Sequence, residues 1–169
     1  FNVPFTYIVN SEVDSPVFAR GFANFIAAAR AVKAFRHLRI LQVATRPAGF
    51  WTMICNEGEL LERFGIETYP VTLVDIQNLT LAIERDGGAD LDAVIERIRS
   101  ALDCTEVGAD DIRRIASLQL ALARTAADHG CSAIAIQCWD SLQAGIGIMP
   151  CLANALLTDD GIPTVCETD

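Results

Sequence analysis

Four short apolar stretches, separated by segments of helical length, constrain the fold of this chain more than any other feature. They are residues 38–43, 67–74, 132–137 and 163–166. Strands that alternate with helices in this way are typical of βαβ units, in which the strands pair in parallel. The pattern therefore predicts an α/β fold with an open, mostly parallel sheet flanked by helices, in a Rossmann-like, doubly wound arrangement. Pro70 indicates that the second stretch lies at an edge or contains a bend.

Start and stop signals mark the helices between these stretches. Ser15-Pro16 begins a helix that runs to about residue 35, because Ser caps a helix well and Pro fits its first turn. Gly65 ends a short helix over 57–64 as a left-handed cap. A loop that contains glycines is expected over 139–150, and further helices over 79–102 (in two pieces around 86–88), from about 107–110 to 128, and over 151–158.

The length and the two ends of the chain bear on its domain organisation. A chain of 169 residues fits one domain. It begins with Phe rather than Met and stops where its last strand would end. We therefore expect residues 1–169 to be a single α/β domain cut from a larger enzyme.

Charge and hydropathy argue against two classes of partner. The formal net charge is −9, and Lys and Arg form no run, whereas nucleic-acid binding requires a basic face. No apolar run approaches the roughly 20 residues that span a bilayer, and no signal peptide is visible. We expect a cytoplasmic protein that binds neither nucleic acid nor membrane.

The six cysteines show no spacing of a zinc site, because no two form a close ligand pair. A disulfide framework is typical of small secreted domains rather than of an α/β chain of this size. We therefore expect buried, reduced thiols at all six positions, which are Cys55, Cys104, Cys131, Cys138, Cys151 and Cys166.

Two carboxylates, Glu167 and Asp169, follow the last predicted strand. Ligands of open α/β sheets gather at the carboxyl ends of the strands. Residues two apart on a strand point to the same face, so these side chains repel each other unless a cation lies between them or one is solvated. Hard divalent cations such as Mg²⁺ and Mn²⁺ prefer carboxylate oxygens. The spacing suggests a metal site, and the alternative is a solvated, fraying C-terminus.

Side chains suited to a hydroxylated ligand follow two other strands. Trp139 can cover the C–H face of a sugar, and the amides of Gln137 and Gln143 can bond to its hydroxyls. Arg46, in the loop after the first strand, can bind a carboxylate or a substrate hydroxyl. The alternatives are that Trp139 fills the core, that Gln143 faces solvent and that Arg46 forms a surface ion pair.

Several of these segments together resemble the L-fucose isomerase-like family. They are Arg46-Pro47-Ala48-Gly49-Phe50, Leu60 to Glu67, Gln137-Cys138-Trp139, Ile148-Met149-Pro150-Cys151, Asp159 to Pro163, and Cys166-Glu167-Thr168-Asp169. The resemblance covers most of the chain from residue 39 onward. It implies a three-domain ketol isomerase, which interconverts an aldose and a ketose, and it implies that this chain is the middle domain.

The resemblance also implies roles for particular residues. Glu167 corresponds to a family Glu that binds a divalent metal, usually Mn²⁺, and takes part in proton transfer. The remaining ligands, a further carboxylate and a His, would lie beyond residue 169. The family's substrate-facing Gln corresponds here to Trp139, with Gln137 and Gln143 nearby. This departure from the family pattern argues against fucose itself as the substrate. The family also suggests a homo-oligomer.

Isomerisation removes a proton beside a carbonyl and returns it to the neighbouring carbon, through an ene-diol intermediate. A metal stabilises the ene-diolate, and a nearby carboxylate serves as base. One Glu holds such an ion poorly, so we expect this chain alone to be inactive and to bind Mn²⁺ weakly or not at all. The alternative is a non-catalytic sugar-binding or protein-interaction domain. Nucleotide binding is disfavoured, because Gly145 and Gly147 give only part of the glycine fingerprint.

Overall fold

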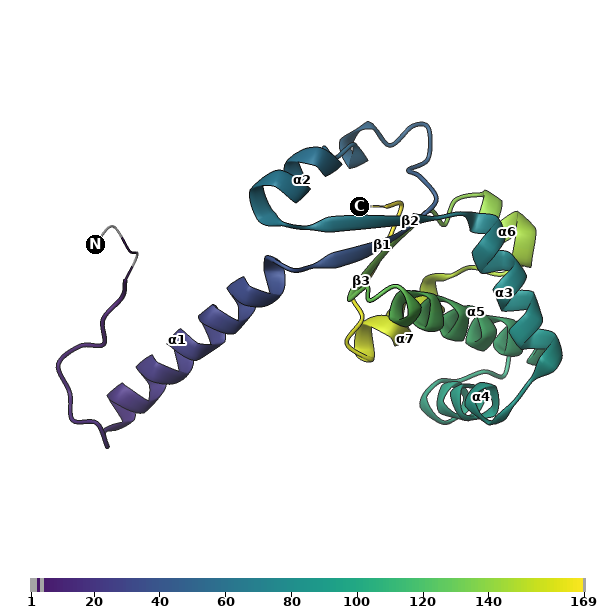
Figure 1. Ribbon diagram of the computed structural model, residues 1–169. Helices are drawn as coiled ribbons and strands as arrows, with labels where there is room; N and C mark the ends of the chain where they lie inside the picture. The colour runs from purple at the N-terminus through teal and green to yellow at the C-terminus, as the bar shows by residue number, and fades with distance from the viewer. Residues whose placement is uncertain (1–2, 4, 169) are drawn as a thin grey trace. The chain divides into compact units, whose positions relative to one another are not determined.

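The computed structural model describes residue 3 and residues 5–168, and the chain forms two compact units. The first unit ends at His37 and the second begins at Leu38. In the first unit, an extended segment precedes α1 (Pro16–Phe35) (Figure 1). Ser15 Oγ caps α1 by accepting a hydrogen bond from the Phe18 N–H at 3.2 Å, which confirms the predicted helix start. Whether residues 1–169 are one domain of a larger enzyme stays a prediction.

Within the described residues, the second unit contains a four-stranded sheet in the order β2-β1-β3-β4, and every neighbouring pair is parallel. The predicted α/β fold with an open parallel sheet is thereby confirmed. The edge position of β2 agrees with its internal Pro70, which has no N–H for a neighbouring strand. The strands are β1 (Arg39–Val43), β2 (Glu67–Val71), β3 (Ala133–Ile136) and β4 (Thr164–Cys166).

Helices lie on both sides of this sheet (Figure 1). In that view α5 and α7 lie on one side, and α2 lies on the other. The turn η1 (Trp51–Met53) precedes α2 in the chain. The helices of the second unit are α2 (Glu57–Phe64), α3 (Leu73–Asp86), α4 (Ala89–Ala101), α5 (Ala109–Asp128), α6 (Ser141–Ile146) and α7 (Cys151–Asp159).

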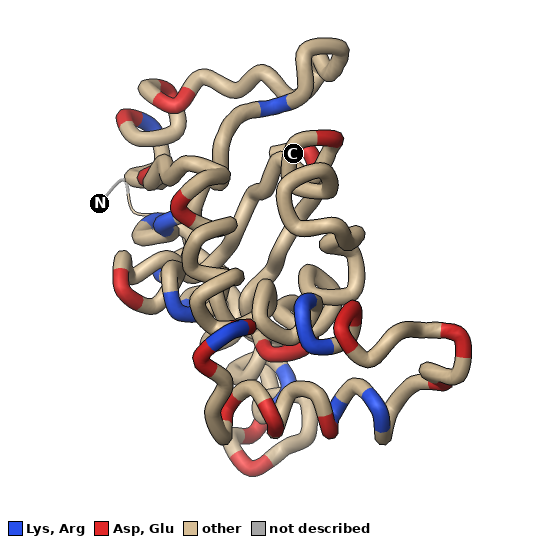
Figure 2. Tube along the Cα trace, turned by 90° about the vertical axis from the view of Figure 1, so that its right-hand side faces the viewer, with Lys and Arg blue, Asp and Glu red and all other residues tan. Residues whose placement is uncertain are grey.

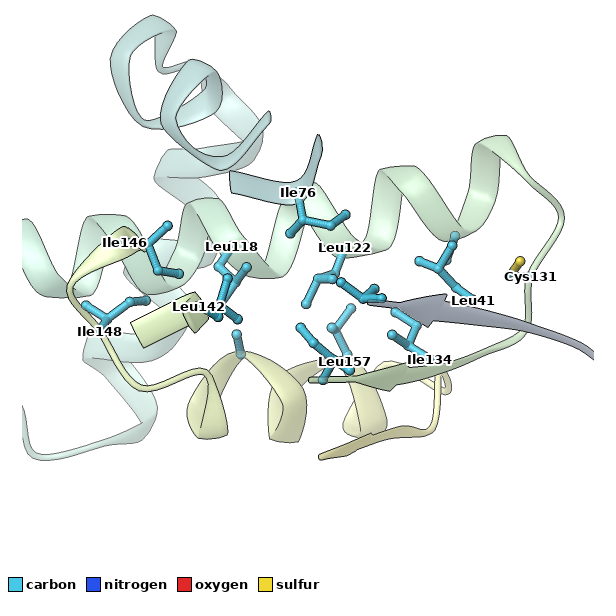
Figure 3. Close-up of a cluster of buried hydrophobic side chains, with 14 residues drawn as sticks. Leu41, Ile76, Leu118, Leu122, Cys131, Ile134, Leu142, Ile146, Ile148 and Leu157 are labelled. Atoms are coloured by element: carbon cyan, nitrogen blue, oxygen red, sulfur yellow. The ribbon is translucent and has the colours of Figure 1, made fainter. Parts of the chain in front are cut away.

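Alternate residues of the two central strands form the main core on one face of the sheet. These residues pack against side chains of α3, α5 and α7, and Figure 3 shows Leu122 and Leu157 close to the strands. Each of the four strand side chains is at most 1% exposed, so burial of β-branched and leucine side chains fixes which face of the sheet points inward. They are Leu41, Val43, Ile134 and Ile136.

The opposite face of the sheet is less completely filled. Residues of β1 and β3 that alternate with the core residues, together with side chains of η1 and α2, line a cavity of about 470 Å³. The strand residues that line it include Ile40, Gln42, Ala133 and Ala135. One face of the sheet therefore supplies the core and the other supplies a cavity.

The structure differs from the prediction in two segments of the chain, residues 67–79 and residues 139–150. The strand predicted over 67–74 ends at Val71, because Thr72 starts α3 with a capping box: Asp75 N–H donates to Thr72 Oγ1 at 3.2 Å, and Thr72 N–H donates to Asp75 Oδ2 at 3.3 Å. The helix predicted from residue 79 therefore begins at Leu73. The loop predicted over 139–150 contains the short helix α6, which ends at a left-handed Gly147.

Acidic and basic residues are interspersed along the helices (Figure 2). Over residue 3 and residues 5–168, no helix combines the length and the apolar character that crossing a membrane requires.

Candidate functional site

The carboxyl ends of β1, β3 and β4 lie at one edge of the sheet. Ile136 at the end of β3 pairs with Val43 of β1 and with Cys166 of β4, so all three strands end at the same level. In the strand order, β2 lies beside β1 at one edge of the sheet and β4 lies beside β3 at the other edge, so the connections from β1 to β2 and from β3 to β4 run in opposite directions. In doubly wound sheets a reversal of this kind between two neighbouring strands opens the crevice in which ligands bind. The loops after β1, β3 and β4 are therefore the candidate site.

Residues with a strained backbone conformation lie at this same edge of the sheet. Among the described residues, the non-glycine residues with positive φ are Ala44 (63°), Glu167 (61°) and Thr168 (58°). Ala44 directly follows β1, and the other two directly follow β4. Left-handed backbone costs about 1–3 kcal/mol for each such residue and persists where the surroundings hold it, often at functional sites.

Glu167 lies one residue beyond the end of β4, in a left-handed turn rather than in the strand. Its position at the carboxyl end of the sheet was predicted, but the strand alternation used to place it does not extend that far. Its carboxylate accepts a hydrogen bond at Oε1 from the Cys138 thiol at 2.7 Å. Oε2 is buried and has no hydrogen-bond partner among the described residues. Asp169, the second predicted ligand, lies outside the described residues.

Cys138 is 4% exposed and lies two residues beyond β3. Burial raises the pKa of its thiol well above the usual range, and the hydrogen bonds with the Glu167 carboxylate and with Cys166 add to the rise. The thiol therefore keeps its proton at neutral pH and donates a hydrogen bond to the carboxylate. Sequence reasoning placed Cys138 among inert buried thiols and missed this contact.

Trp139 links two of the loops. Its ring contacts Phe50 edge-on, with ring centroids 5.6 Å apart at an interplanar angle of 79°. The Trp139 side chain is 52% exposed, so it does not fill the core. Gln137 lies between β3 and Trp139, and its amide donates to the Trp139 carbonyl at 3.2 Å.

Arg46 is held by its own loop. Its guanidinium lies over the Trp51 ring, 5.0 Å from the centroid, and Nη1 donates to the carbonyls of Pro47 and Ala48 at 3.2 and 3.3 Å. No carboxylate of the described residues forms an ion pair with Arg46, so the surface ion pair considered as its alternative role does not form there.

The structure brings some of the candidates together and leaves others apart. Arg46 and Thr168, the neighbour of Glu167, both line the cavity of about 470 Å³. Trp139 approaches this region through Phe50 of the same loop as Arg46. Gln143 lies on α6 and is half-buried, but it does not line that cavity. The roles assigned to these side chains stay predictions.

The described residues do not by themselves complete a metal site. No group of three or more His, Cys, Asp or Glu side chains that could hold an ion exists among them. Glu167 Oε2, which is buried and has no hydrogen-bond partner within residue 3 and residues 5–168, fits a single carboxylate ligand. A hard cation needs several oxygen ligands, so further ligands would have to come from outside the described part of the chain.

The expectation that all six cysteines are buried was wrong for four of them, of which Cys104 and Cys166 are half-buried. Cys55 and Cys151 are exposed, whereas Cys131 and Cys138 are buried.

We predict that iodoacetamide at about pH 8 alkylates Cys55 and Cys151 in the native chain and leaves Cys138 unmodified, because its raised pKa and its burial leave no accessible thiolate for the reagent. Peptide mass spectrometry of the labelled chain measures this.

The denatured chain is the control for this labelling, since every thiol should then react. Alkylation of native Cys138 as fast as of Cys55 would contradict the buried, hydrogen-bonded thiol.

Comparison with known proteins finds a similarity to proteins named sulfoquinovose isomerase. The chain is 22% identical to the one from Priestia aryabhattai over 166 residues, which is 98% of this chain and 36% of that protein. The relative from Priestia megaterium gives the same figures. A relative from a Clostridium species is 22% identical over 165 residues, with the same shares covered. No protein-family model matches the chain.

The chain thus spans 36% of the length of these curated relatives. Their name is that of a sugar isomerase, which supports the sugar isomerase part of the resemblance. The assignment to the L-fucose isomerase-like family remains a prediction.

Proposed function

We propose that this chain is a domain of a metal-dependent sugar isomerase, which interconverts an aldose and a ketose through an ene-diol intermediate. The observation that carries the proposal is Glu167, a carboxylate at the edge where the loops after β1, β3 and β4 meet, with one buried oxygen that has no hydrogen-bond partner among the described residues. The relatives named sulfoquinovose isomerase support the class of reaction.

Glu167 is the catalytic residue of this proposal. Its carboxylate takes the proton from the carbon beside the sugar carbonyl and returns it to the neighbouring carbon, as a general base and then a general acid. Bound Mn²⁺, or another hard divalent cation such as Mg²⁺, would polarise the sugar's carbonyl and hydroxyl oxygens and stabilise the ene-diolate. In this proposal the ligand or the proton meets Oε2 of Glu167, the oxygen without a hydrogen-bond partner in the described part of the chain.

The rest of the site belongs, in this proposal, to other parts of the protein. The chain spans 36% of the relatives' length, and its described residues hold no group of three metal-ligating side chains. The remaining ligands therefore lie in further domains of the same protein or in a neighbouring subunit of a homo-oligomer, and Asp169 is a further, weaker ligand. On this account the 169-residue chain alone is inactive.

Arg46 supports a substrate with an anionic group. Sulfoquinovose, the sugar in the relatives' name, carries a sulfonate. The guanidinium of Arg46 is held in place by Trp51 and two carbonyls but has no ion-pair partner among the described residues. Its charge is therefore available to a sulfonate. In the same proposal Trp139, with Gln137 and Gln143 nearby, contacts the sugar ring and its hydroxyls.

A non-catalytic sugar-binding or protein-interaction domain is the second candidate function. The observation that favours it is the lack of a three-ligand metal cluster in the described part of the chain. The two functions differ in one outcome, because only an isomerase converts the sugar.

The first prediction from the proposal concerns Glu167. In the full-length protein with Mn²⁺, E167Q should lower kcat for aldose-to-ketose conversion by roughly 100-fold or more, because the amide cannot accept the proton. An assay of ketose formation over a panel of aldoses that includes sulfoquinovose measures this. E62Q is the matched control, since Glu62 is an exposed residue of α2.

Full activity in folded E167Q would remove Glu167 from the mechanism. No conversion of any aldose by the wild-type protein, together with sugar binding in calorimetry, would favour the binding domain instead.

The second prediction concerns Arg46. R46Q should raise KM for sulfoquinovose about 10- to 100-fold, because a charge-assisted hydrogen bond contributes about 1.5–3 kcal/mol. KM for an uncharged aldose should change little. R99Q is the control, since Arg99 is an exposed cation on α4 without an ion-pair partner among the described residues. Equal effects of R46Q on charged and uncharged sugars would contradict a role in anion recognition.

A further inference from the structure

The carboxylate of Glu167 is held at one oxygen only. Oε1 accepts a hydrogen bond from Cys138 Sγ at 2.7 Å, and Oε2 is buried without a hydrogen-bond partner among the residues described. A carboxylate in water is solvated at both oxygens, and a buried polar atom left without a partner costs free energy. An asymmetric arrangement of this kind suggests that Oε2 is kept for a ligand.

Two neighbouring strands create the contact. Cys138 follows β3 and Glu167 follows β4, and the last register pair of these strands is Ile136 with Cys166. Beyond that pair, the Thr168 N–H donates to the Ile136 carbonyl at 3.2 Å, which turns the chain back toward β3. The positive φ of Glu167 and of Thr168 belongs to this turn. The backbone thus adopts an unfavourable conformation that brings the carboxylate against the thiol.

A second layer of contacts supports the thiol. Cys166 lies close enough to Cys138 to help raise the pKa of its thiol, and Asn154 Nδ2, from α7, donates to Cys166 Sγ at 3.2 Å. Asn154 and Cys138 are each 4% exposed. The Cys138 thiol is therefore oriented by its hydrogen bond to the carboxylate, next to the half-buried Cys166 of β4, which the buried Asn154 of α7 holds in turn.

We propose that Cys138 is a positioning residue for Glu167: its thiol holds Oε1, so that Oε2 alone faces the reacting groups. The inference rests on the proposed function, because it assigns the role of the free oxygen in that reaction. Cys138 itself does not touch substrate or metal. Partners of this kind, which orient a ligand or base without meeting the substrate, typically contribute 10- to 100-fold to activity or metal affinity.

The kinetic test uses the full-length protein with Mn²⁺ and the variants C138A and C138S. C138A removes the donor, so kcat should fall about 10- to 100-fold while KM changes by less than about threefold. C138S should recover part of the loss, since a hydroxyl also donates to a carboxylate. C131A is the matched control: Cys131 is a second buried cysteine, close to the other end of β3. It should keep wild-type kinetics.

A spectroscopic test on the 169-residue chain is independent of activity. The difference between infrared spectra of the wild-type chain and of C138S isolates the S–H stretching band of Cys138. A thiol bonded to a carboxylate absorbs at lower frequency than one bonded to a neutral amide. The same band in the E167Q chain is obtained from the difference between the spectra of E167Q and of the double variant with E167Q and C138S. Without the carboxylate, this band should lie at higher frequency than in the wild-type chain.

The outcomes separate this inference from the proposed function. A band that does not move in the E167Q background, or C138A with unchanged kcat, overturns the positioning role. C138S as impaired as C138A would also contradict it, because packing rather than donation would then matter. A wild-type protein without isomerase activity refutes the proposed function, and with it the catalytic purpose of the contact, while the infrared shift would still report the hydrogen bond.

Discussion

The parallel pairing of β3 with β1 and with β4 is the constraint on which the rest of this structure depends. It places the ends of the three strands at one level, and it joins residues that are far apart in the sequence. The Cys138–Glu167 contact spans 29 positions, and the cavity that reaches both Arg46 and Thr168 spans more. Burial of Leu41 and Ile134 against the helices holds this register, because a shift by one residue would turn both side chains out of the core.

Much of the fold could be predicted from the sequence, because its signals are local. The apolar runs gave the strands, Ser15 and Gly65 marked helix ends that the structure confirms, and Pro70 marked an edge strand. The errors are also local in origin. Thr72 can extend a strand as well as cap a helix, and the second role prevails because Asp75 completes a capping box. The helix α6 contains Gly145 and is six residues long, so its sequence resembles a loop.

The candidate site could be predicted only in outline. That Glu167 follows a strand is visible in the sequence, and ligands bind at such ends. Its partner could not be predicted, because no local pattern tells which thiol meets a carboxylate after the strands pair. The same limit explains why Trp139 and Phe50, which come from different loops, were not expected to touch. Side-chain chemistry indicates what a residue can bind, whereas strand order decides which residues meet.

The central claim is that Glu167 moves a proton between neighbouring carbons of a sugar. Exchange in deuterated water tests it most directly, because a carboxylate base that meets solvent during the reaction leaves deuterium on the sugar. Proton NMR of the aldose and ketose, after turnover by the full-length protein with Mn²⁺, should show deuterium at the carbons between which the proton is moved. The E167Q variant should incorporate none. Equal incorporation by E167Q and the wild-type protein would contradict the account.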